Sequence, residues 1–581
     1  MNRRTEARAQ QLLTEATQLH RTGQRAAAEQ AYVAALALSP DAVEALRSLA
    51  AVRSELGRPE LALDALLRVQ RLRPNDALAQ YHAANALLQQ NRGAEALVAL
   101  QRAVALKPNF FEAHLSLAQA KLRHADHDGA IAAYGDALRL RPESSDALIG
   151  LCDVHLLRFD WQSALAAADS VVQRAPGNAN ALYVKGGLLG LSGRIDDAEA
   201  VTRAALAFDP THAGAYSNLG AIAMWRRDYT QSVADYRHAL ELRPEIHDAQ
   251  SGLAYALLAQ GEFEQGWAQH ERSRPLGVLA YTRKEPVLWD GTPMPTGTLT
   301  LFCEAGLGDV LQFCRLVPRL KGRVGRVVLY LQPYYLPLAR LLATLDGVDQ
   351  ITADAESLHR GDACLSLLSL PYLFNVSLCD AADPAPYLRA DAALSAHWAE
   401  CLRDDDHRPR VGLVWGGNPR LAQARISVLD RRRSVPLSML EPLLATPAVS
   451  FYCLQKGIAA EQLQGSPLAS RLVDRTAELG DFADTAALIE QLDLTITVDT
   501  SVAHLAGALG KPVWMLNRFD SCWRWGPQRE DAPWYPTLRI FRQPAFGDWA
   551  SVVERVAQEL RQWPARRSPR AHRQQSSSQL A

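Results

Sequence analysis

The 34 residues 75–108, NDALAQYHAANALLQQNRGAEALVALQRAVALKP, decide the fold of the first half of the chain. A proline closes this unit, and prolines recur every 34 residues from one end of the half to the other. A fixed period of this length is the signature of a stack of structural repeats. The prolines are Pro40, Pro74, Pro108, Pro142, Pro176, Pro210 and Pro244.

Two columns of small residues accompany the prolines. Small side chains let two helix axes approach closely, and proline ends the second helix because it lacks an N–H and clashes with the preceding turn. Each unit is therefore predicted to be a pair of packed helices. One column, 24 positions before each proline, is Ala16, Ala50, Ala84, Ala118, Cys152, Gly186 and Gly220, and the other, 12 positions before, is Ala28, Ala62, Ala96, Ala130, Ala164, Ala198 and Ser232.

A helical pair of this length resembles the tetratricopeptide repeat. The resemblance covers residues 7–278, as seven repeats followed by a capping repeat that lacks the proline. It implies an all-α solenoid that holds a protein partner in its groove.

Composition is that of an ordinary globular protein. At 581 residues the chain is too long for one core, and 62 basic against 63 acidic residues point to neither nucleic acid nor a membrane surface. The eight cysteines form no CxxC pair, which favours a reducing compartment. The N-terminal segment lacks the apolar core typical of a signal peptide, and no uncharged run is long enough to span a membrane, so we expect a cytoplasmic protein.

The pattern changes after residue 278. Residues 279–297 have the composition of a linker, rich in proline and glycine. Six β-branched runs then alternate with helical stretches, which predicts parallel, doubly wound sheets. They divide into α/β halves at 298–405 and 406–565, and we expect a disordered tail at 566–581. The runs are TLTLFC, GRVVLYLQ, RVGLVW, SFYCLQ, LTITV and KPVWML.

The first candidate site follows the strand TLTLFC, in the segment EAGLGD that ends at Asp309. Gly306 and Gly308 allow a tight turn and a close approach of a ligand to the helix N-terminus, and we group Gln312 with them in an acceptor-side loop. Asp309 lies at the mouth of the predicted sheet, where open α/β folds bind ligands. It is either a reactive carboxylate or a helix cap.

The second candidate site follows the strand LTITV. Asp499, Thr500 and Ser501 open a helix whose N-terminal N–H groups suit a phosphate. His504 lies one turn further on the same face, unless it is a packed core residue.

Other loops at carboxyl ends of predicted strands join this site. Their Arg and Lys side chains could neutralise a departing diphosphate without a metal. For Arg431 and Arg432 the alternative is a solvated surface loop. The residues assigned to phosphate here are Gly417, Asn418, Arg433, Ser434 and Lys456.

Three further features have competing interpretations. Trp523 and Trp525 beside Arg524 are candidates for a sugar or base contact, although most tryptophans are core, and Asp484 is grouped with them. The residues 404–406, DDD, have DxD spacing but lie in a charged linker, and a metal site at His124 and His127 in a repeat turn is improbable. EAGLGD lacks the third glycine of a dinucleotide fingerprint. We therefore expect neither a metal nor a cofactor.

Six ordered segments together resemble the heptosyltransferase-like domain of bacterial glycosyltransferase family 9. The segments are EAGLGDVLQFCR, GLVWGGNP with DRRRSVPL, LQKG, DFADTAALI, DTSVAHLAGALGKPVW and REDAPWYP. The resemblance implies a GT-B fold of two Rossmann-like domains and an inverting, metal-independent transfer from a nucleotide sugar. It implies Asp309 as general base, Asp499 near the donor sugar, and the amides of Thr500, Ser501 and Val502 near the diphosphate. The chain departs from the family pattern at Leu421, where a histidine is expected, and at 422–429, which look like an insertion.

The sequence thus predicts a glycosyltransferase whose repeats recruit a macromolecular acceptor, which we interpret as a protein. Its substrate would be a nucleotide-diphosphate sugar, and no nucleic-acid partner is expected. Two alternatives stay open: a scaffold whose sugar-nucleotide domain has lost turnover, and an enzyme like protein O-linked N-acetylglucosamine transferase.

Overall fold

The computed structural model describes residues 3–158, 160–274, 286–378, 386–403, 408–418, 424–526 and 528–566. The DxD at 404–406, Leu421 and the tail from 567 onward lie outside these residues, as do residues 279–285 of the predicted linker. The chain forms two compact units, residues 1–188 and 189–581, which we describe separately.

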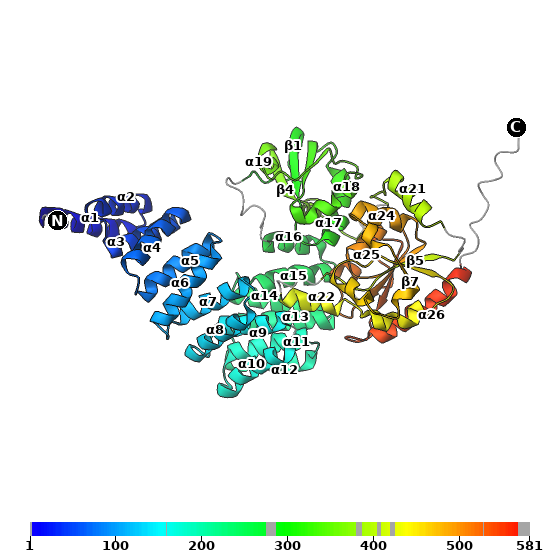
Figure 1. The fold of residues 1–581 in the computed structure, drawn as a ribbon. Coiled ribbons are helices and arrows are strands. Elements are labelled where there is room, and N and C mark those ends of the chain that lie inside the picture. The colour runs from blue at the N-terminus through cyan, green and yellow to red at the C-terminus, as the bar shows by residue number, and fades with distance from the viewer. Residues whose placement is uncertain are drawn as a thin grey trace. The chain divides into compact units, whose positions relative to one another are not determined.

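Helices follow one another in antiparallel pairs through the first half of the chain (Figure 1). The predicted all-α solenoid is therefore confirmed. No helix in the described ranges is both long and apolar enough to cross a membrane. The helices are α1 (Arg3–Arg21), α2 (Arg25–Leu38), α3 (Val43–Glu55), α4 (Pro59–Leu72), α5 (Ala77–Gln89), α6 (Gly93–Leu106), α7 (Phe111–Arg123), α8 (His127–Leu140), α9 (Ser145–Leu157), α10 (Trp161–Arg174), α11 (Ala179–Leu191), α12 (Ile195–Phe208), α13 (Ala213–Arg226), α14 (Tyr229–Leu242), α15 (His247–Gln260) and α16 (Phe263–Ser273).

The two small columns meet as their spacing predicts. In one repeat the Cys152 thiol donates to the carbonyl oxygen of Ala164, 3.4 Å away. In a later repeat the Ser232 hydroxyl donates to the carbonyl oxygen of Gly220 at 2.8 Å. A Cβ at Gly220 would lie 2.8 Å from the ring of Tyr236, so this position has no room for a side chain. The second helix of each of the seven proline-closed pairs ends two residues before the proline.

The first sheet has four parallel strands in the order β3-β2-β1-β4. Its first strand begins at Met294 rather than at the predicted residue 298, and Leu288 forms a further bridge to Cys364. The end of the predicted linker is thus part of the sheet. The strands are β1 (Met294–Phe302), β2 (Val324–Tyr330), β3 (Gln350–Thr352) and β4 (Ala363–Ser366).

The second sheet has six parallel strands in the order β10-β9-β8-β5-β6-β7. The chain builds outward from β5 in one direction and from β8 in the other, so the order reverses between these two strands. Ligands bind open α/β sheets at such a reversal. The strands are β5 (Arg410–Val414), β6 (Ser450–Cys453), β7 (Leu472–Asp474), β8 (Leu494–Val498), β9 (Val513–Asn517) and β10 (Leu538–Arg542).

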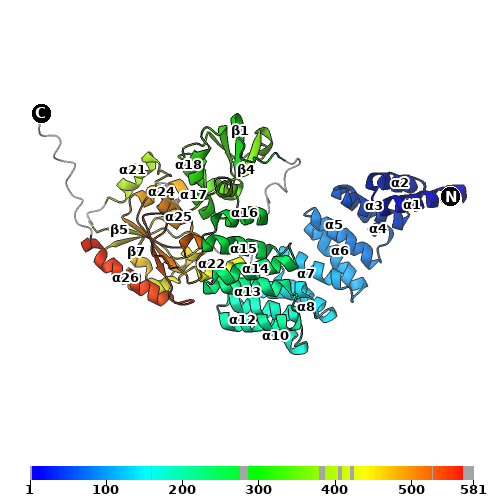
Figure 2. The same ribbon diagram turned by 180° about the vertical axis from the view of Figure 1, so that it is seen from behind.

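Helices flank both sheets, and Figure 2 shows the same arrangement from behind. The predicted parallel α/β architecture is confirmed. The α-helices of this part are α17 (Leu307–Phe313), α18 (Ala339–Leu342), α19 (Ser357–Arg360), α20 (Leu370–Leu373), α21 (Ala392–Cys401), α22 (Ala424–Arg432), α23 (Glu441–Leu444), α24 (Phe482–Glu490), α25 (Ser501–Ala508) and α26 (Trp549–Arg566).

The last repeat shares its core with the α/β part. Leu258 of α15 and Trp267 of α16 belong to one buried cluster with residues of β1, α17 and α25. The sequence placed the end of an independent array at residue 278, whereas the compact units divide at Leu188. The last repeat belongs to the second unit because its final helix buries an aromatic face against the first sheet's helices instead of facing solvent.

Candidate functional site

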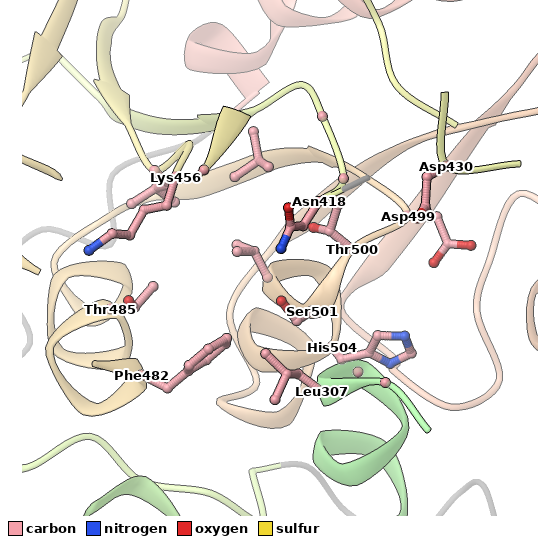
Figure 3. Close-up of a pocket in the computed structure, with 18 of the residues that line it drawn as sticks. Leu307, Asn418, Asp430, Lys456, Phe482, Thr485, Asp499, Thr500, Ser501 and His504 are labelled. Carbon is pink, nitrogen blue, oxygen red and sulfur yellow. The ribbon is translucent and has the colours of Figure 1, made fainter. Parts of the chain in front are cut away.

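A cavity of about 870 Å³ opens between the two α/β halves (Figure 3). It lies where the order of the second sheet reverses, because residues that follow β5 and β8 both line it. The predicted residues that line it are Gly306, Gly308, Asp309, Gly417, Asn418, Arg433, Lys456, Asp499, Thr500, Ser501, Val502 and His504.

The N-terminus of α25 faces this cavity. Thr500 precedes the helix, and its side chain does not cap it. The first N–H groups of a helix have no intrahelical partner and carry the positive end of the helix dipole. In Figure 3 Thr500 and Ser501 lie beside Asn418 at the helix end, with His504 further along the same helix. This end of the cavity is therefore suited to an anion.

Asp499 presents a carboxylate to the same space. The residue is partly buried, and its carboxylate makes no hydrogen bond or ion pair with any residue that the structure describes. Its backbone carbonyl instead accepts a hydrogen bond from Arg433 Nη1 at 3.1 Å. The side chain is thus available to a ligand.

Three cations besides Arg524 line the cavity. Arg433 is ion-paired to Asp430 at 2.5 Å, and Arg518 lies 3.7 Å from a carboxylate oxygen of Asp520. Lys456 donates to the carbonyl oxygen of Leu479 and has no carboxylate partner within the described ranges. Positive charge therefore lines the cavity, with Arg433 hydrogen-bonded to Asp499 just before the helix N-terminus. Arg518 follows β9, so the rule that selected the other loops also applies to it, and our sequence reasoning missed it.

Ser434 is not part of the cavity wall. Its hydroxyl accepts the N–H of Gly417 at 3.0 Å and donates to the carbonyl oxygen of Asp430 at 2.8 Å. A Cβ at Gly417 would lie 2.8 Å from Arg433 Nε, so the glycine gives the guanidinium room. Ser434 therefore positions the loop rather than contacting a phosphate directly.

Both carboxylate oxygens of Asp309 are engaged. Oδ2 accepts the N–H of Gly306 at 2.8 Å, and Oδ1 accepts Nη2 of Arg524 at 2.5 Å. The helix-cap interpretation of Asp309 is thus confirmed, and the ion pair is added to it. The left-handed residue of this turn is Ala305, with φ 61°, and not a glycine. Backbone strain of this kind is concentrated at functional sites.

Arg524 comes from the 3-10 helix η10 (Trp523–Trp525). Its Nε donates to Gln312, so this predicted acceptor-side residue holds the arginine and does not line the cavity. Its guanidinium lies 4.7 Å from the ring centroid of Trp523 and 5.5 Å from that of Phe313. Sequence reasoning noted Arg524 only as a neighbour of tryptophans.

Trp523 and Trp525 are core residues and not ligand contacts. Both are buried, and neither lines the cavity. Trp523 packs edge-on against Trp534, with ring centroids 5.9 Å apart, and Trp525 lies 5.3 Å from the ring of His504. The rings support the cavity wall from behind.

His504 is also buried, as the alternative interpretation held, although it reaches the cavity. Its Nδ1 is hydrogen-bonded to the hydroxyl of Tyr535 at 2.9 Å. Burial lowers its pKa to about 4, so the ring is neutral at neutral pH. A Cβ on Gly308 would lie 2.7 Å from the ring, so Gly308 lets α17 approach α25 closely.

Asp484 caps α24 and does not line the cavity. Its carboxylate accepts the N–H groups of Gly480 and Asp481 at 3.1 and 3.2 Å. The neighbouring Phe482 and Thr485 take the place predicted for it in the cavity wall, opposite Leu307 (Figure 3). The phenyl ring provides an apolar surface that sequence reasoning did not assign.

Arg432 is not in a solvated loop. It ends α22, the helix formed by much of the apparent insertion, which lies beside α14 in both Figure 1 and Figure 2. Its guanidinium is ion-paired to Asp520 at 2.7 Å and lies 4.2 Å from the ring centroid of Phe546. Burial lowers its pKa to about 10. Arg431 is exposed, as the alternative interpretation held, but it lies in α22 and not in a loop.

One group of metal-ligand type lies away from the cavity. The nearest ligand atoms of His397, Cys401 and Glu478 lie within 4.8 Å of one another at the surface. Glu478 is already ion-paired to Arg475, 2.7 Å away. The group has no part in the chemistry of the cavity.

The last repeat forms a wall behind Arg524. Trp267 packs edge-on against Phe313 and Trp523, with ring centroids 5.7 and 5.3 Å apart. The partly buried Arg274 pairs with Glu304 at 2.8 Å, at the start of the segment that leads to Asp309. The repeats are thus in direct contact with the residues that hold Arg524.

Comparison with known proteins identifies the repeats. Tetratricopeptide-repeat models match residues 13–77, 115–179, 158–213 and 218–266, and a further TPR-repeat model matches residues 84–124. The repeats are tetratricopeptide repeats. Such arrays present extended surfaces to which proteins bind, so this chain is capable of protein interaction.

Similarity to individual proteins is more distant. Protein FlbA of Caulobacter vibrioides is 26% identical over 436 residues, which is 64% of this chain and 71% of FlbA. A tetratricopeptide repeat protein from Parabacteroides merdae is 14% identical, with a TM-score of 0.35 over 43% of this chain and 99% of that one. Yeast Tom70 is 15% identical, with a TM-score of 0.35 over 44% of this chain and 56% of that one.

Proposed function

We propose that the α/β part transfers a sugar from a nucleotide-diphosphate sugar to a hydroxyl group of a protein that the repeats bind. The observation that carries this proposal is the cavity at the sheet reversal, which is lined by the N-terminus of α25, by the cations Arg433, Lys456 and Arg518, and by the unpaired carboxylate of Asp499. The helix N-terminus and the cations suit a diphosphate, and the carboxylate of Asp499 suits sugar hydroxyls.

The fold supports the same proposal. Each half carries a parallel sheet that builds outward from its first strand, in the manner of a Rossmann-like domain. The cavity lies between the two halves, as a donor site does in a GT-B enzyme. Five of the six sequence segments with family resemblance supply its wall, at Asp309, Gly417, Lys456, Thr485 and Thr500.

The proposed reaction is a single displacement. The acceptor oxygen attacks the anomeric carbon, the bond from that carbon to the diphosphate oxygen breaks, and the nucleoside diphosphate leaves with the electron pair. The acceptor proton passes to a carboxylate, for which we propose Asp309. The N–H groups of α25, with Lys456 and Arg433, stabilise the charge on the leaving group. Side-chain cations fill this role, so the proposal needs no divalent ion.

A non-catalytic scaffold is the second candidate, and one observation favours it. Both oxygens of Asp309 are already engaged, by Gly306 and by Arg524, and a carboxylate held in this way is a weak base. A domain that only binds a sugar nucleotide could keep this arrangement unchanged.

A ligand screen followed by a turnover assay separates these functions. Nucleotide sugars, UDP-N-acetylglucosamine among them, are tested for thermal stabilisation, because tight binding raises the midpoint by mass action. Each one that binds is then assayed for transfer to bound protein and for hydrolysis. Stabilisation that persists in EDTA, together with turnover, supports the transferase. Stabilisation with neither transfer nor hydrolysis supports the scaffold, and no stabilisation by any sugar nucleotide contradicts both.

A further inference from the structure

Arg524 joins the two α/β halves across the cavity. It belongs to the second half, whereas the carboxylate that it pairs with, Asp309, belongs to α17 of the first half. We propose that Arg524 is an anion-released clamp, which holds Asp309 in the empty site and lets it go when a donor phosphate draws the guanidinium away. This inference rests on the proposed function, because it assumes that a diphosphate enters this cavity.

The other cavity arginines are held within their own half. Arg433 pairs with Asp430 and Arg518 lies beside Asp520, and all four residues belong to the second half. Arg524 differs from them in that its carboxylate partner, Asp309, lies on the opposite half. A ligand that attracts Arg524 therefore changes a contact of the first half, which a ligand of Arg433 or Arg518 does not.

The surroundings of Arg524 permit this exchange. The guanidinium lines the cavity, and the rings of Trp523 and Phe313 lie against it. These rings guide the side chain without supplying a charge of their own. The guanidinium also donates to the amide oxygen of Gln312 and to the sulfur of Cys522, neither of which is a carboxylate. Asp309 is thus the charged partner that a phosphate would have to replace.

A diphosphate is a strong competitor for a guanidinium. It offers several anionic oxygens in the geometry that the planar fork of arginine matches, whereas Asp309 offers one oxygen. Loss of the ion pair makes Asp309 a better proton acceptor, because a neighbouring cation favours the charged form of a carboxylate. Donor binding would then prepare the base for the acceptor hydroxyl.

The clamp and a simple anion-binding role of Arg524 predict different effects of removing the charge of Asp309. If Asp309 competes with the anion for Arg524, removing the charge of Asp309 must tighten anion binding, since the coupling between the two is reciprocal. If Asp309 does not hold Arg524 away from the anion, removing the charge of Asp309 should change the anion affinity little.

The test measures pyrophosphate binding to the full chain by titration calorimetry. We expect Asp309→Asn to tighten binding about fivefold or more, which is the usual lower range of such coupling. We expect Arg524→Gln to weaken binding, and Asp309→Asn combined with Arg524→Gln to bind no tighter than Arg524→Gln alone. Asp309→Glu keeps the charge and should show no tightening.

Controls separate folding from binding. Arg529→Gln breaks an exposed Arg–Asp pair with Asp531 and should leave pyrophosphate binding unchanged. Asp309→Ser is a second neutral variant that keeps a capping oxygen, in case Asp309→Asn does not fold. If the wild type binds pyrophosphate but neither Asp309→Asn nor Asp309→Ser binds it more tightly, the clamp is overturned and the phosphate site of the proposed function is not. Absence of pyrophosphate binding in the wild type contradicts the phosphate site of the proposed function, and the clamp with it.

Discussion

Trp267 donates a hydrogen bond through Nε1 to the carbonyl oxygen of Val376, 2.7 Å away, and so ties the last repeat to the first α/β half. The indole is 2% exposed. We expect Trp267→Ala to lower the free energy of unfolding of the second unit by about 3–5 kcal/mol, because it leaves a large cavity and an unpaired carbonyl. Denaturant unfolding measures this change. Phe208→Ala, at a side chain that is 60% exposed, is the matched control and should cost little.

The same contact predicts where the chain can be cut. A fragment of residues 178–566 keeps α11 to α16 and should unfold cooperatively, whereas a fragment of residues 286–566 exposes the surface that Trp267 covers and should aggregate. The repeats up to Pro176 should fold alone, since repeats close their core against neighbours. Size-exclusion chromatography with thermal melts checks all three. A soluble, cooperative 286–566 fragment would contradict a shared core.

The regular spacing of the prolines and small residues made the repeats predictable from the sequence. It also predicted that the second helix of each pair ends before its proline. Six strands were equally clear, but the sequence reasoning missed β10 (LRIFR), and it also missed β4 (ACLS) and the three-residue strands β3 and β7. These short strands are held by pairing with longer neighbours rather than by their own composition. A single sequence therefore predicts the fold class better than the full strand order.

The site was predicted in part, and its non-local contacts decided what was missed. Residues that follow predicted strands reach the cavity because parallel strands end at one edge of a sheet. No local rule pairs Asp309 with Arg524, which is 215 positions later in the chain. The same holds for Trp523, whose burial depends on Trp267 from the repeats. Contacts between domains need the folded structure.

The contact between α17 and α25 depends on Gly308. A Cβ there would lie 2.7 Å from the buried ring of His504, so we expect Gly308→Ala to destabilise the second unit by about 1–3 kcal/mol through overpacking. Gly135→Ala is the matched control, because its Cβ would meet open space in helix α8. Helix propensity should make that change neutral or slightly stabilising. Chemical denaturation of both variants decides, and equal effects would argue against close packing at Gly308.

His504 gives stability a pH dependence. Burial lowers its pKa in the folded state to about 4, below its ordinary value of 6.5, so the unfolded chain binds more protons between these pH values. The contribution of His504 to stability should therefore be fully present above about pH 6.5. The free energy of unfolding should fall by about 3 kcal/mol as the pH drops toward 4. His270, whose pKa is also lowered to about 4, acts in the same direction.

The variant His504→Asn tests this dependence. Asparagine does not titrate, so its melting temperature should change less between pH 7 and pH 4.5 than that of the wild type. His270 remains as a second source of pH dependence, and His504→Asn combined with His270→Asn should flatten the profile further. Parallel profiles for the wild type and both variants would show that neither histidine is neutral and buried in solution.

The last prediction distinguishes the roles of the two aspartates in transfer. Asp309→Asn keeps an oxygen that can cap α17 but cannot take a proton, so transfer should fall by about 10²- to 10⁴-fold while donor binding is kept or tightened. Asp499→Asn should weaken donor binding as well, because the free carboxylate loses charge-assisted hydrogen bonds worth about 1.5–3 kcal/mol. Single-turnover rates and donor dissociation constants for both variants give the comparison. If Asp309→Asn is as active as the wild type, the general base is another residue. Because Asp499 is the unpaired cavity carboxylate, a loss of rate confined to Asp499→Asn at saturating donor would identify it as the proton acceptor instead.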